Sequence, residues 1–250
     1  MKSNKEIFLK FILNYGIFSG GKMFLNCKLK RFSNLKVPGI KYGLKLRNGT
    51  SDLETFYQIF LDQEYTTELI KSPNVVIDAG ANIGLFTVFI KSQFPNAKVI
   101  SIEPDKENYE VLRENVSEYK DVSTENCGLW YKKTGLKVYD KFYMGKWGLI
   151  VEEDNENSNV QAITLNEIVE KYKLTHIDIL KLDIESSEKY LFKDNFNKWL
   201  PITKMIIIEL HDRFETGCSK VFFEFINKHI PNYTFSISGE NVIILNNDLL

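Results

Sequence analysis

The chain of 250 residues contains few cysteines, and they form no pattern. Cys27, Cys127 and Cys218 are odd in number and widely spaced, which argues against both a disulfide framework and a cysteine-based metal site. Sparse cysteine fits a reducing compartment, so we expect a cytoplasmic protein. Long apolar runs are also missing. The strongest one, from Ile7 to Phe18, is interrupted by a lysine and an asparagine and is too short to span a bilayer.

Acidic residues are almost absent from the first 47 positions. Eleven lysines and arginines stand there against Glu6 alone, a net charge of +10, so the formal charge of -1 for the whole chain leaves -11 for the remainder. We interpret this basic arm either as a contact surface for an anion, membrane lipid or a phosphorylated substrate, or as a solvated face. Five apolar residues recur there at helical spacing and predict a helix that packs on the domain, with interfacial membrane attachment as the alternative: Ile7, Phe8, Phe11, Ile12 and Tyr15.

From Val75 onward, strand-like and helix-like segments alternate, which predicts a mostly parallel sheet with helices on both faces. One of these strands is expected over residues 122–129, and a polar stretch with several short β-like pieces follows over residues 131–159. Two β-like runs on either side of residues 239–241 predict an antiparallel hairpin at the end of the sheet.

Residues 37–50 read as strand material broken by glycines, which predicts a small N-terminal cap rather than a separate domain. The predicted fold is therefore a doubly wound, Rossmann-like α/β domain over residues 51–250. A basic cap of helix and strand is expected over residues 1–50.

The stretch VVIDAGANIGLFTVFIK, from Val75 to Lys91, reads as a buried strand, a tight glycine turn and the start of a helix. A dinucleotide site would prefer three glycines, and only Gly80 and Gly84 are present. Asp78 ends the strand where phosphates would lie, and its carboxylate would repel a pyrophosphate. S-adenosylmethionine has a sulfonium, an ammonium and no phosphate, so the same acid becomes an attractive partner, and the helix N-terminus suits the methionine carboxylate. The turn therefore predicts S-adenosylmethionine as the ligand.

Glu103 ends the next strand about 20 residues after the glycine turn, where an acid usually takes the two ribose hydroxyls. Pro104 follows and ends that strand. Residues Asn126 to Leu129, which end the third strand and include Cys127, are expected near the adenine. Loop capping is the alternative role for Asp78 and Glu103. The residues expected to hold the cofactor are Asp78, Gly80, Ala81, Asn82, Gly84, Glu103, Pro104, Cys127 and Asp183.

Polar clusters end two later strands: Asp183 and Glu185 in LDIE, and Glu209 and His211 in ELHD. Residues two apart on a strand share a face, so each pair is expected at the edge of the sheet where ligands bind. His211 is the first candidate for a general base, because an unperturbed imidazole titrates near neutral pH; a hydrogen bond to a neighbouring loop is its alternative role. Asp183 is expected to orient the acceptor, assist the base or contact the methionine ammonium. The acids alternatively collect Mg²⁺, and the metal stays unassigned.

From about Leu44 to Ile226, the chain resembles the FkbM-type family of S-adenosylmethionine-dependent methyltransferases. The matching pieces are LRNGTSDLETF, EY at Glu64 and Tyr65, VVIDAGANIGLFT, SIEPDKENY, TLNEI, IDILKLDIESSE and IIIELHDRFETGCS. The resemblance implies a class I methyltransferase fold and O-methylation of a sugar or another small polyhydroxylated metabolite, such as a glycoconjugate or polysaccharide precursor. Members of the family usually carry a glycine just after the acid that corresponds to Glu185. Here Ser186 and Ser187 follow it, and either serine is expected to cap the next helix.

Three other functions compete with this reading. Enzymes that methylate exocyclic base amines typically use an (N/D)-P-P-(Y/F) motif, and this sequence has no Pro-Pro pair, so an RNA methyltransferase rests on the basic arm alone. A non-catalytic cofactor-binding or assembly protein is the second alternative, and the intact glycine turn argues against it. A nicotinamide oxidoreductase is disfavoured by the missing third glycine and by Asp78.

Overall fold

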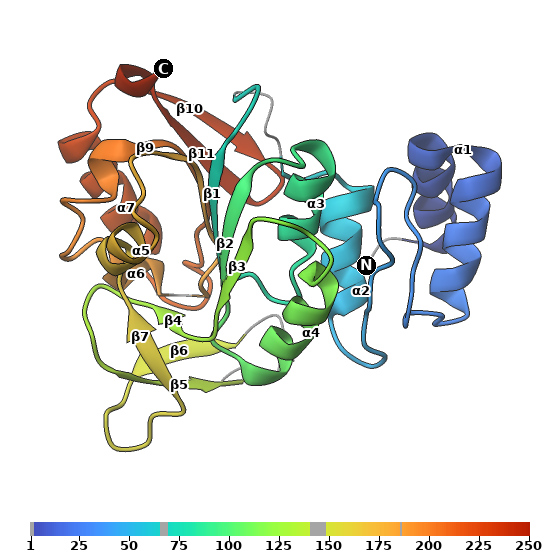
Figure 1. Ribbon diagram of the computed structural model, residues 1–250, viewed down its shortest axis with the longest axis horizontal. Helices are drawn as coiled ribbons and strands as arrows, with labels where there is room; N and C mark the ends of the chain where they lie inside the picture. The colour runs from blue at the N-terminus through green and yellow to red at the C-terminus, as the bar shows by residue number, and fades with distance from the viewer. Residues whose placement is uncertain (1–2, 66–69, 141–148, 186) are drawn as a thin grey trace.

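The computed structural model describes residues 3–65, 70–140, 149–185 and 187–250, and a seven-stranded sheet lies at its centre (Figure 1). The strands follow the order β10-β11-β9-β8-β1-β2-β3. Their bounds are β1 Val75–Ala79, β2 Lys98–Ile102, β3 Val122–Glu125, β8 Ile177–Leu182, β9 Thr203–Glu209, β10 Tyr233–Ser238 and β11 Asn241–Asn246. β11 pairs antiparallel with both β9 and β10, while the other neighbours pair in parallel. The predicted sheet and its C-terminal hairpin are confirmed.

Helices cover both faces of this sheet (Figure 1). One face carries α3 Leu85–Gln93 and α4 Lys106–Val116, and the other carries α5 Leu165–Tyr172, α6 Glu188–Leu191 and α7 Cys218–His229. Because side chains alternate along a strand, Val76 packs in the first core and Ile77 in the second. Burial on both faces explains why β1 and β8 are apolar except at Asp78, Asp178 and Lys181. Two of these three charges belong to the site described below.

The polar stretch after β3 folds into a second sheet. Its order is β4-β7-β5-β6, with β4 Gly128–Leu129, β5 Gly135–Tyr139, β6 Ile150–Glu153 and β7 Val160–Ile163. Trp130, Leu136, Val151 and Val160 form a small core for it. The prediction of one strand over residues 122–129 is wrong. The side chain of Asn126 donates hydrogen bonds to the carbonyl oxygens of residues 103 and 104, and the chain passes there from one sheet to the other.

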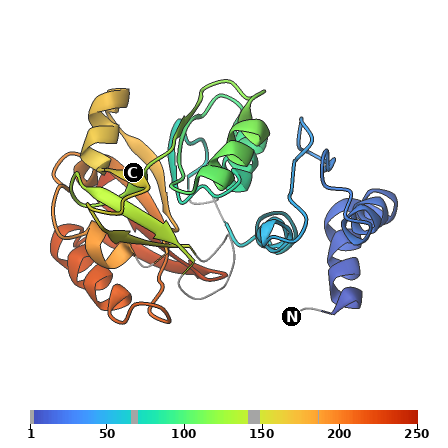
Figure 2. The same cartoon turned by 90° about the horizontal axis from the view of Figure 1, so that it is seen from below.

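The N-terminal helix is bent into a hairpin of two helical arms. α1 spans Asn4–Lys28, but Gly16 has φ 76° and ψ 167°, so the helix breaks there. The arms approach closely at Gly20, where an added Cβ would lie 2.2 Å from the carbonyl oxygen of Phe11. The rings of Phe8 and Phe24 meet across the arms at 5.1 Å between centroids. In both views α1 lies at the edge of the molecule, with α2 (Asp52–Phe56) between it and the sheet (Figures 1 and 2).

The predicted helix does pack on the rest of the protein. Phe11 is fully buried, and its ring centroid lies 6.5 Å from that of Phe56 and 6.0 Å from that of Tyr57. The strand expected over residues 37–50 is wrong, because that region contains only an isolated bridge that joins Leu44 to Leu35.

A buried ion pair crosses the expected boundary between cap and domain. Arg47 donates from its backbone N–H and its guanidinium to Asp52, which is fully buried. The boundary at residue 50 stays a prediction, and the two parts share one hydrophobic core. Among the described residues, no helix combines the length and apolar content that crossing a bilayer requires.

We expect Phe11→Ala to lower the free energy of unfolding by about 3–5 kcal/mol, because it removes a fully buried ring and leaves a cavity. Leu13 lies on the same arm but is 81% exposed, so Leu13→Ala should change stability by less than about 0.5 kcal/mol. Urea unfolding of both variants measures the difference. Equal stability of the two variants would show that α1 does not pack as described.

Candidate active site

Two adjoining cavities lie at the carboxyl ends of β1, β2, β8 and β9. The chain turns in opposite directions after β1 and β8, and open α/β sheets bind ligands at such a switch point. The first cavity is a slot with apolar walls from Ile102, Leu129 and Val151. The second is wider, about 680 Å³. Residues shared by both are Gly80, Asn82, Asp183 and Glu185.

The glycine turn brings the loops after β1 and β8 into contact. Gly80 has φ 72°, and an added Cβ would lie 1.7 Å from the carbonyl oxygen of Asp183, so only glycine fits. Gly84 is also left-handed and begins α3, while the N–H groups of Gly80 and Ala81 both donate to the carbonyl oxygen of Ile102. These contacts hold the backbone of the predicted turn in place, and the turn separates the two cavities.

Glu103 is buried at the side of the slot. It accepts hydrogen bonds from the N–H groups of Asn82 at 2.8 Å and Asp105 at 2.9 Å. Burial raises its pKa to about 7, and these two backbone hydrogen bonds act against that rise. The predicted loop capping is present, and Glu103 also lines the slot. Next to it, Oδ1 of Asn82 is buried without a hydrogen-bond partner in the described part of the chain.

Asp78 lies below the cavities and, among the described residues, lines neither of them. Its Oδ2 accepts a hydrogen bond from Thr87 at 2.7 Å, and its Oδ1 lies 3.4 Å from Nζ of Lys181, its register partner on β8. The side chain is fully buried, and burial raises its pKa. The predicted contact between Asp78 and a cofactor stays a prediction. In this position Asp78 supports the glycine turn from beneath through Thr87 and Lys181.

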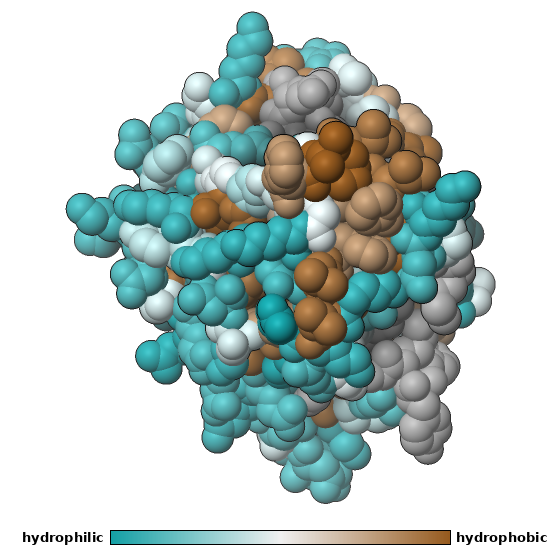
Figure 3. All heavy atoms as spheres, turned by 90° about the vertical axis from the view of Figure 1, so that its right-hand side faces the viewer, coloured by the Kyte–Doolittle hydropathy of each residue, from teal (hydrophilic) through white to brown (hydrophobic). Residues whose placement is uncertain are grey.

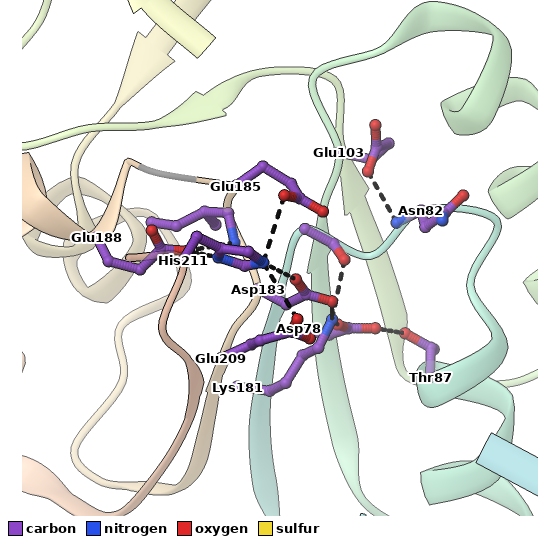
Figure 4. A network of polar contacts seen from close by, with 12 residues as sticks. Asp78, Asn82, Thr87, Glu103, Lys181, Asp183, Glu185, Glu188, Glu209 and His211 are labelled. Atoms are coloured by element: carbon purple, nitrogen blue, oxygen red, sulfur yellow. Dashed lines mark hydrogen bonds and ion pairs between the residues drawn. The ribbon is translucent and has the colours of Figure 1, made fainter. Parts of the chain in front are cut away.

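Lys181 is a functional residue that the sequence analysis missed. Its buried ammonium donates to the carbonyl oxygen of Gly80 at 2.9 Å and to Oδ2 of Asp183 at 3.3 Å (Figure 4). Burial acts to lower the pKa of Lys181, but Asp183, Tyr65 and Asp78 together raise it above its ordinary value. A lone lysine inside the apolar run IDILKL was the available signal.

His211 is surrounded by four carboxylates (Figure 4). Its Nδ1 donates to Oε1 of Glu188 at 2.9 Å, and its Nε2 lies 3.3 Å from an oxygen of both Glu185 and Glu209 and 3.9 Å from Asp183. The structure thus joins the two predicted pairs into one cluster. Burial lowers the pKa of His211, but the hydrogen bond to Glu188 and the surrounding carboxylates raise it to about 12.

The expectation of an ordinary imidazole pKa is therefore wrong. His211 is 1% exposed and, within the described ranges, lines neither cavity, whereas Asp183, Glu185 and Glu209 line the wider one. Burial raises the pKa of Glu185 to about 8, and the charge of His211 acts against that rise. His211 contacts the acids rather than the open cavity, and its role as a general base stays a prediction.

Of the remaining predicted residues, some line a cavity and others do not. Pro104 lines the slot and Ala81 the wider cavity. Cys127 and Leu129 both pack in the second core, and of these two residues expected near the adenine only Leu129 lines the slot. Ser187 is the N-cap residue of α6, but its side chain makes no capping hydrogen bond. Ser186 lies outside the described residues.

Many residues that line the wider cavity were not predicted from the sequence as site residues. Four aromatic side chains line it: Tyr65, Phe86, Phe214 and Tyr57. The first two come from separate segments, and only their packing beside Lys181 shows that they share a site, since its Nζ lies 5.8 and 5.9 Å from their ring centroids.

We expect Lys181→Met to lower the free energy of unfolding at pH 7 by about 3–5 kcal/mol, because it leaves Asp78 and Asp183 without their buried cation. Lys91 is also buried, but its ammonium donates only to two carbonyl oxygens, so Lys91→Met should cost about 1–3 kcal/mol. Urea unfolding of both variants compares them. A smaller loss for Lys181→Met than for Lys91→Met would contradict the assigned ion pairs.

Comparison with known proteins shows the family and the fold of this chain. The family model for the methyltransferase FkbM domain matches residues 78–237. Methyltransferase sdnD of Sordaria araneosa is 26% identical over 188 residues, which cover 62% of this chain and 73% of that protein. The 31-O-demethyl-FK506 methyltransferase FkbM of Streptomyces tacrolimicus is 21% identical over 192 residues, 63% of this chain and 74% of that protein.

The crystal structure of methyltransferase FkbM from Methylobacillus flagellatus KT is similar in fold. The TM-score is 0.50 at 15% sequence identity, and the match covers 97% of this chain and 58% of that one. This chain therefore spans less than two thirds of that structure's length, and the likeness concerns the fold. Because the family model matches more than half of the 250 residues, the chain belongs to the FkbM family of methyltransferases.

Proposed function

We propose that the protein transfers a methyl group from S-adenosylmethionine to a hydroxyl group of a sugar or another small polyhydroxylated metabolite. The observation that carries this proposal is the junction of the two cavities at Gly80 and Asp183. An apolar slot with a buried acid opens there onto a wider, acid-lined cavity, so a cofactor and an acceptor can meet across one glycine turn.

The side chains of the slot suit the adenosine part of S-adenosylmethionine, and the slot, about 60 Å³, would have to widen to take it. Ile102, Leu129 and Val151 offer apolar walls for a purine, and Glu103 offers carboxylate oxygens to two ribose hydroxyls. Asp183 stands at the shared edge, where its charge suits the positive methionine end of the cofactor. When bound, the cofactor supplies a methyl group already activated by a sulfonium.

The wider cavity suits a neutral, hydroxyl-rich acceptor. Its lining includes seven acidic and three basic side chains, so it offers many hydrogen-bond acceptors to hydroxyl donors. The rings of Tyr65, Phe86 and Phe214 offer apolar faces for the C–H groups of a sugar. The same excess of negative charge repels phosphates, which argues against RNA as the acceptor.

The acceptor hydroxyl must lose a proton as its oxygen takes the methyl group. Asp183, Glu185 and Glu209 line the cavity and are placed to receive that proton, while His211 lies behind them. Glu188 occupies Nδ1 of His211, and its Nε2 faces the acids rather than the open cavity. The catalytic acids therefore act on the acceptor, and His211 positions them.

We expect S-adenosylhomocysteine to bind with an affinity on the order of micromolar and NADH not to bind, measured by calorimetric titration. Glu103→Gln should weaken binding by about 1.5–3 kcal/mol, roughly tenfold to a hundredfold, because it removes one charged acceptor of hydrogen bonds. Glu110 is an exposed acid on α4, so Glu110→Gln is the matched control and should bind normally. Binding of neither ligand by the intact protein would contradict the proposed function.

The same titration has an expected dependence on pH. Ribose hydroxyls donate to the ionised form of Glu103, whose pKa is about 7 in the free protein, so a proton competes with the ligand. Affinity should therefore rise between pH 6 and pH 8, with the gain largely lost in Glu103→Gln. A flat profile in the unchanged protein would place the ribose elsewhere.

A further inference from the structure

The acids around His211 have the donor geometry of a metal site. Single ligand atoms of Asp183, Glu209 and His211 all lie within 4.8 Å of one another. Asp183 directly follows β8 and Glu209 ends β9, and these strands pair in parallel with Leu182 opposite Ile208. Two hydrogen-bonded strand ends therefore hold the carboxylates in place side by side.

His211 gives an independent sign that the cluster receives a ligand. Its Nε2 is aimed into the cluster and lies 3.3 Å from an oxygen of Glu185 and of Glu209 (Figure 4), yet no described carboxylate is in line for a hydrogen bond to it, although the side chain is only 1% exposed. Nδ1 is held by Glu188, which is itself fully buried. In metal sites, a carboxylate that accepts from one ring nitrogen of a histidine orients the other nitrogen toward the ion.

Besides a protonated His211, two cations among the described residues lie near the cluster, so the positive groups are fewer than the carboxyl groups. Lys181 contacts the far oxygen of Asp183, Oδ2, and it also lies beside Asp78. Arg213 reaches Glu209 at 3.4 Å from an exposed position. Two ammonium or guanidinium groups thus stand against Asp78, Asp183, Glu185, Glu188 and Glu209.

We propose that Asp183, Glu209 and His211 bind one divalent transition-metal ion, which takes the place of the Nε2 proton of His211 and releases that proton to solvent. A set of one imidazole nitrogen and two carboxylates suits Mn²⁺, Fe²⁺ or Zn²⁺ better than the all-oxygen preference of Mg²⁺ or Ca²⁺. Because the two acids line the wider cavity, the ion would face the acceptor and lower the pKa of a hydroxyl bound to it. This use of the ion rests on the proposed function, but binding of the ion does not.

The test is a titration of the purified protein with Mn²⁺ alone. The concentration of free Mn²⁺ is measured at each step by electron paramagnetic resonance. We expect one site per chain with micromolar affinity. Glu209→Gln should weaken it at least tenfold. Glu240 lines the same cavity but is not one of the three ligands, so Glu240→Gln removes the same charge and should leave the affinity within twofold.

No loss of the free Mn²⁺ signal at millimolar metal overturns the metal site. Equal weakening by Glu209→Gln and Glu240→Gln also overturns it, because that result describes diffuse attraction by an acidic cavity. Should Glu209→Gln fail to fold by circular dichroism, Asp183→Asn replaces it with the same expected loss. Calorimetry with S-adenosylhomocysteine on the same sample separates the two failures: cofactor binding without Mn²⁺ binding leaves the proposed function intact.

A second observation concerns the α1 hairpin and is independent of the site. Leu13, Ile17 and Phe18, around the break of α1, are 81%, 73% and 93% exposed. Further exposed apolar side chains on or just after α1 are Phe8, Leu9, Leu25 and Leu29. Figure 3 shows apolar side chains gathered on the face of the molecule where α1 lies.

The hairpin that carries this apolar surface is basic. Exposed cations on or just after it are Lys5, Lys22, Lys30 and Arg31, and Glu6 is the only acid in the sequence up to Arg47. A second copy of the chain would bring one +10 arm against another, which disfavours a dimer through this face. We infer that the α1 hairpin binds the surface of an anionic lipid bilayer, with Leu13, Ile17 and Phe18 entering the interface and the lysines meeting the headgroups.

Co-sedimentation with vesicles tests this surface. Vesicles that contain phosphatidylglycerol and phosphatidylcholine should retain the protein, and phosphatidylcholine alone should retain at least tenfold less. The double variant Leu13→Ser with Phe18→Ser should lose retention, whereas Ile237→Ser, which changes a 66% exposed residue of β10, should not. Absent retention, or retention unchanged in the double variant, overturns the inference. So does a dimer that the double variant breaks without any retention by vesicles.

Discussion

The buried ammonium of Lys181 is the constraint on which the site depends. Lys181 pairs in register with Asp78 across β8 and β1, and it contacts both Asp183 and the carbonyl oxygen of Gly80. The charge therefore fastens the glycine turn to the loop after β8 at the switch point of the sheet. A buried cation is tolerated only with such partners, because an unpaired charge in the interior is costly.

This fastening explains why one side of the site is preformed. Gly80 must lack a side chain because the carbonyl of Asp183 lies where a Cβ would be, and the two cavities meet at that contact. The other side is set by His211, which gathers Glu185, Glu188 and Glu209 around one ring. Like charges at such distances repel, so the cluster requires a cation at its centre, either a proton on the imidazole or a metal ion in contact with it.

Much of this arrangement could be predicted from sequence, because local patterns carry it. The buried strand before Gly80, the acid at Glu103 and the C-terminal hairpin follow from periodicity and turn residues, and they position the site. What could not be predicted depends on contacts between distant segments. The partners of Lys181 come from β1 and from its own strand end, and the pKa of His211 depends on acids brought together only by folding. Short β pieces were expected over residues 131–159, but their pairing into a second sheet was not, because the strands are short and polar, with side chains outside the small core around Leu136.

The N-terminal α1 hairpin packs on the domain and also contributes residues to the wall of the wider cavity. Asn4, Ile7 and Lys28 of α1 line the wider cavity. Asp183 and Glu209, at the ends of β8 and β9 in the seven-stranded sheet, line the same cavity. Phe11 and the Arg47–Asp52 ion pair fix the hairpin to the domain, so the cavity keeps that wall. A hairpin that binds lipid with its outer surface and lines the cavity with its inner surface would hold the cavity next to the bilayer. Together with the proposed function, this arrangement would favour an acceptor presented at a membrane, such as a glycoconjugate precursor, over one that diffuses freely.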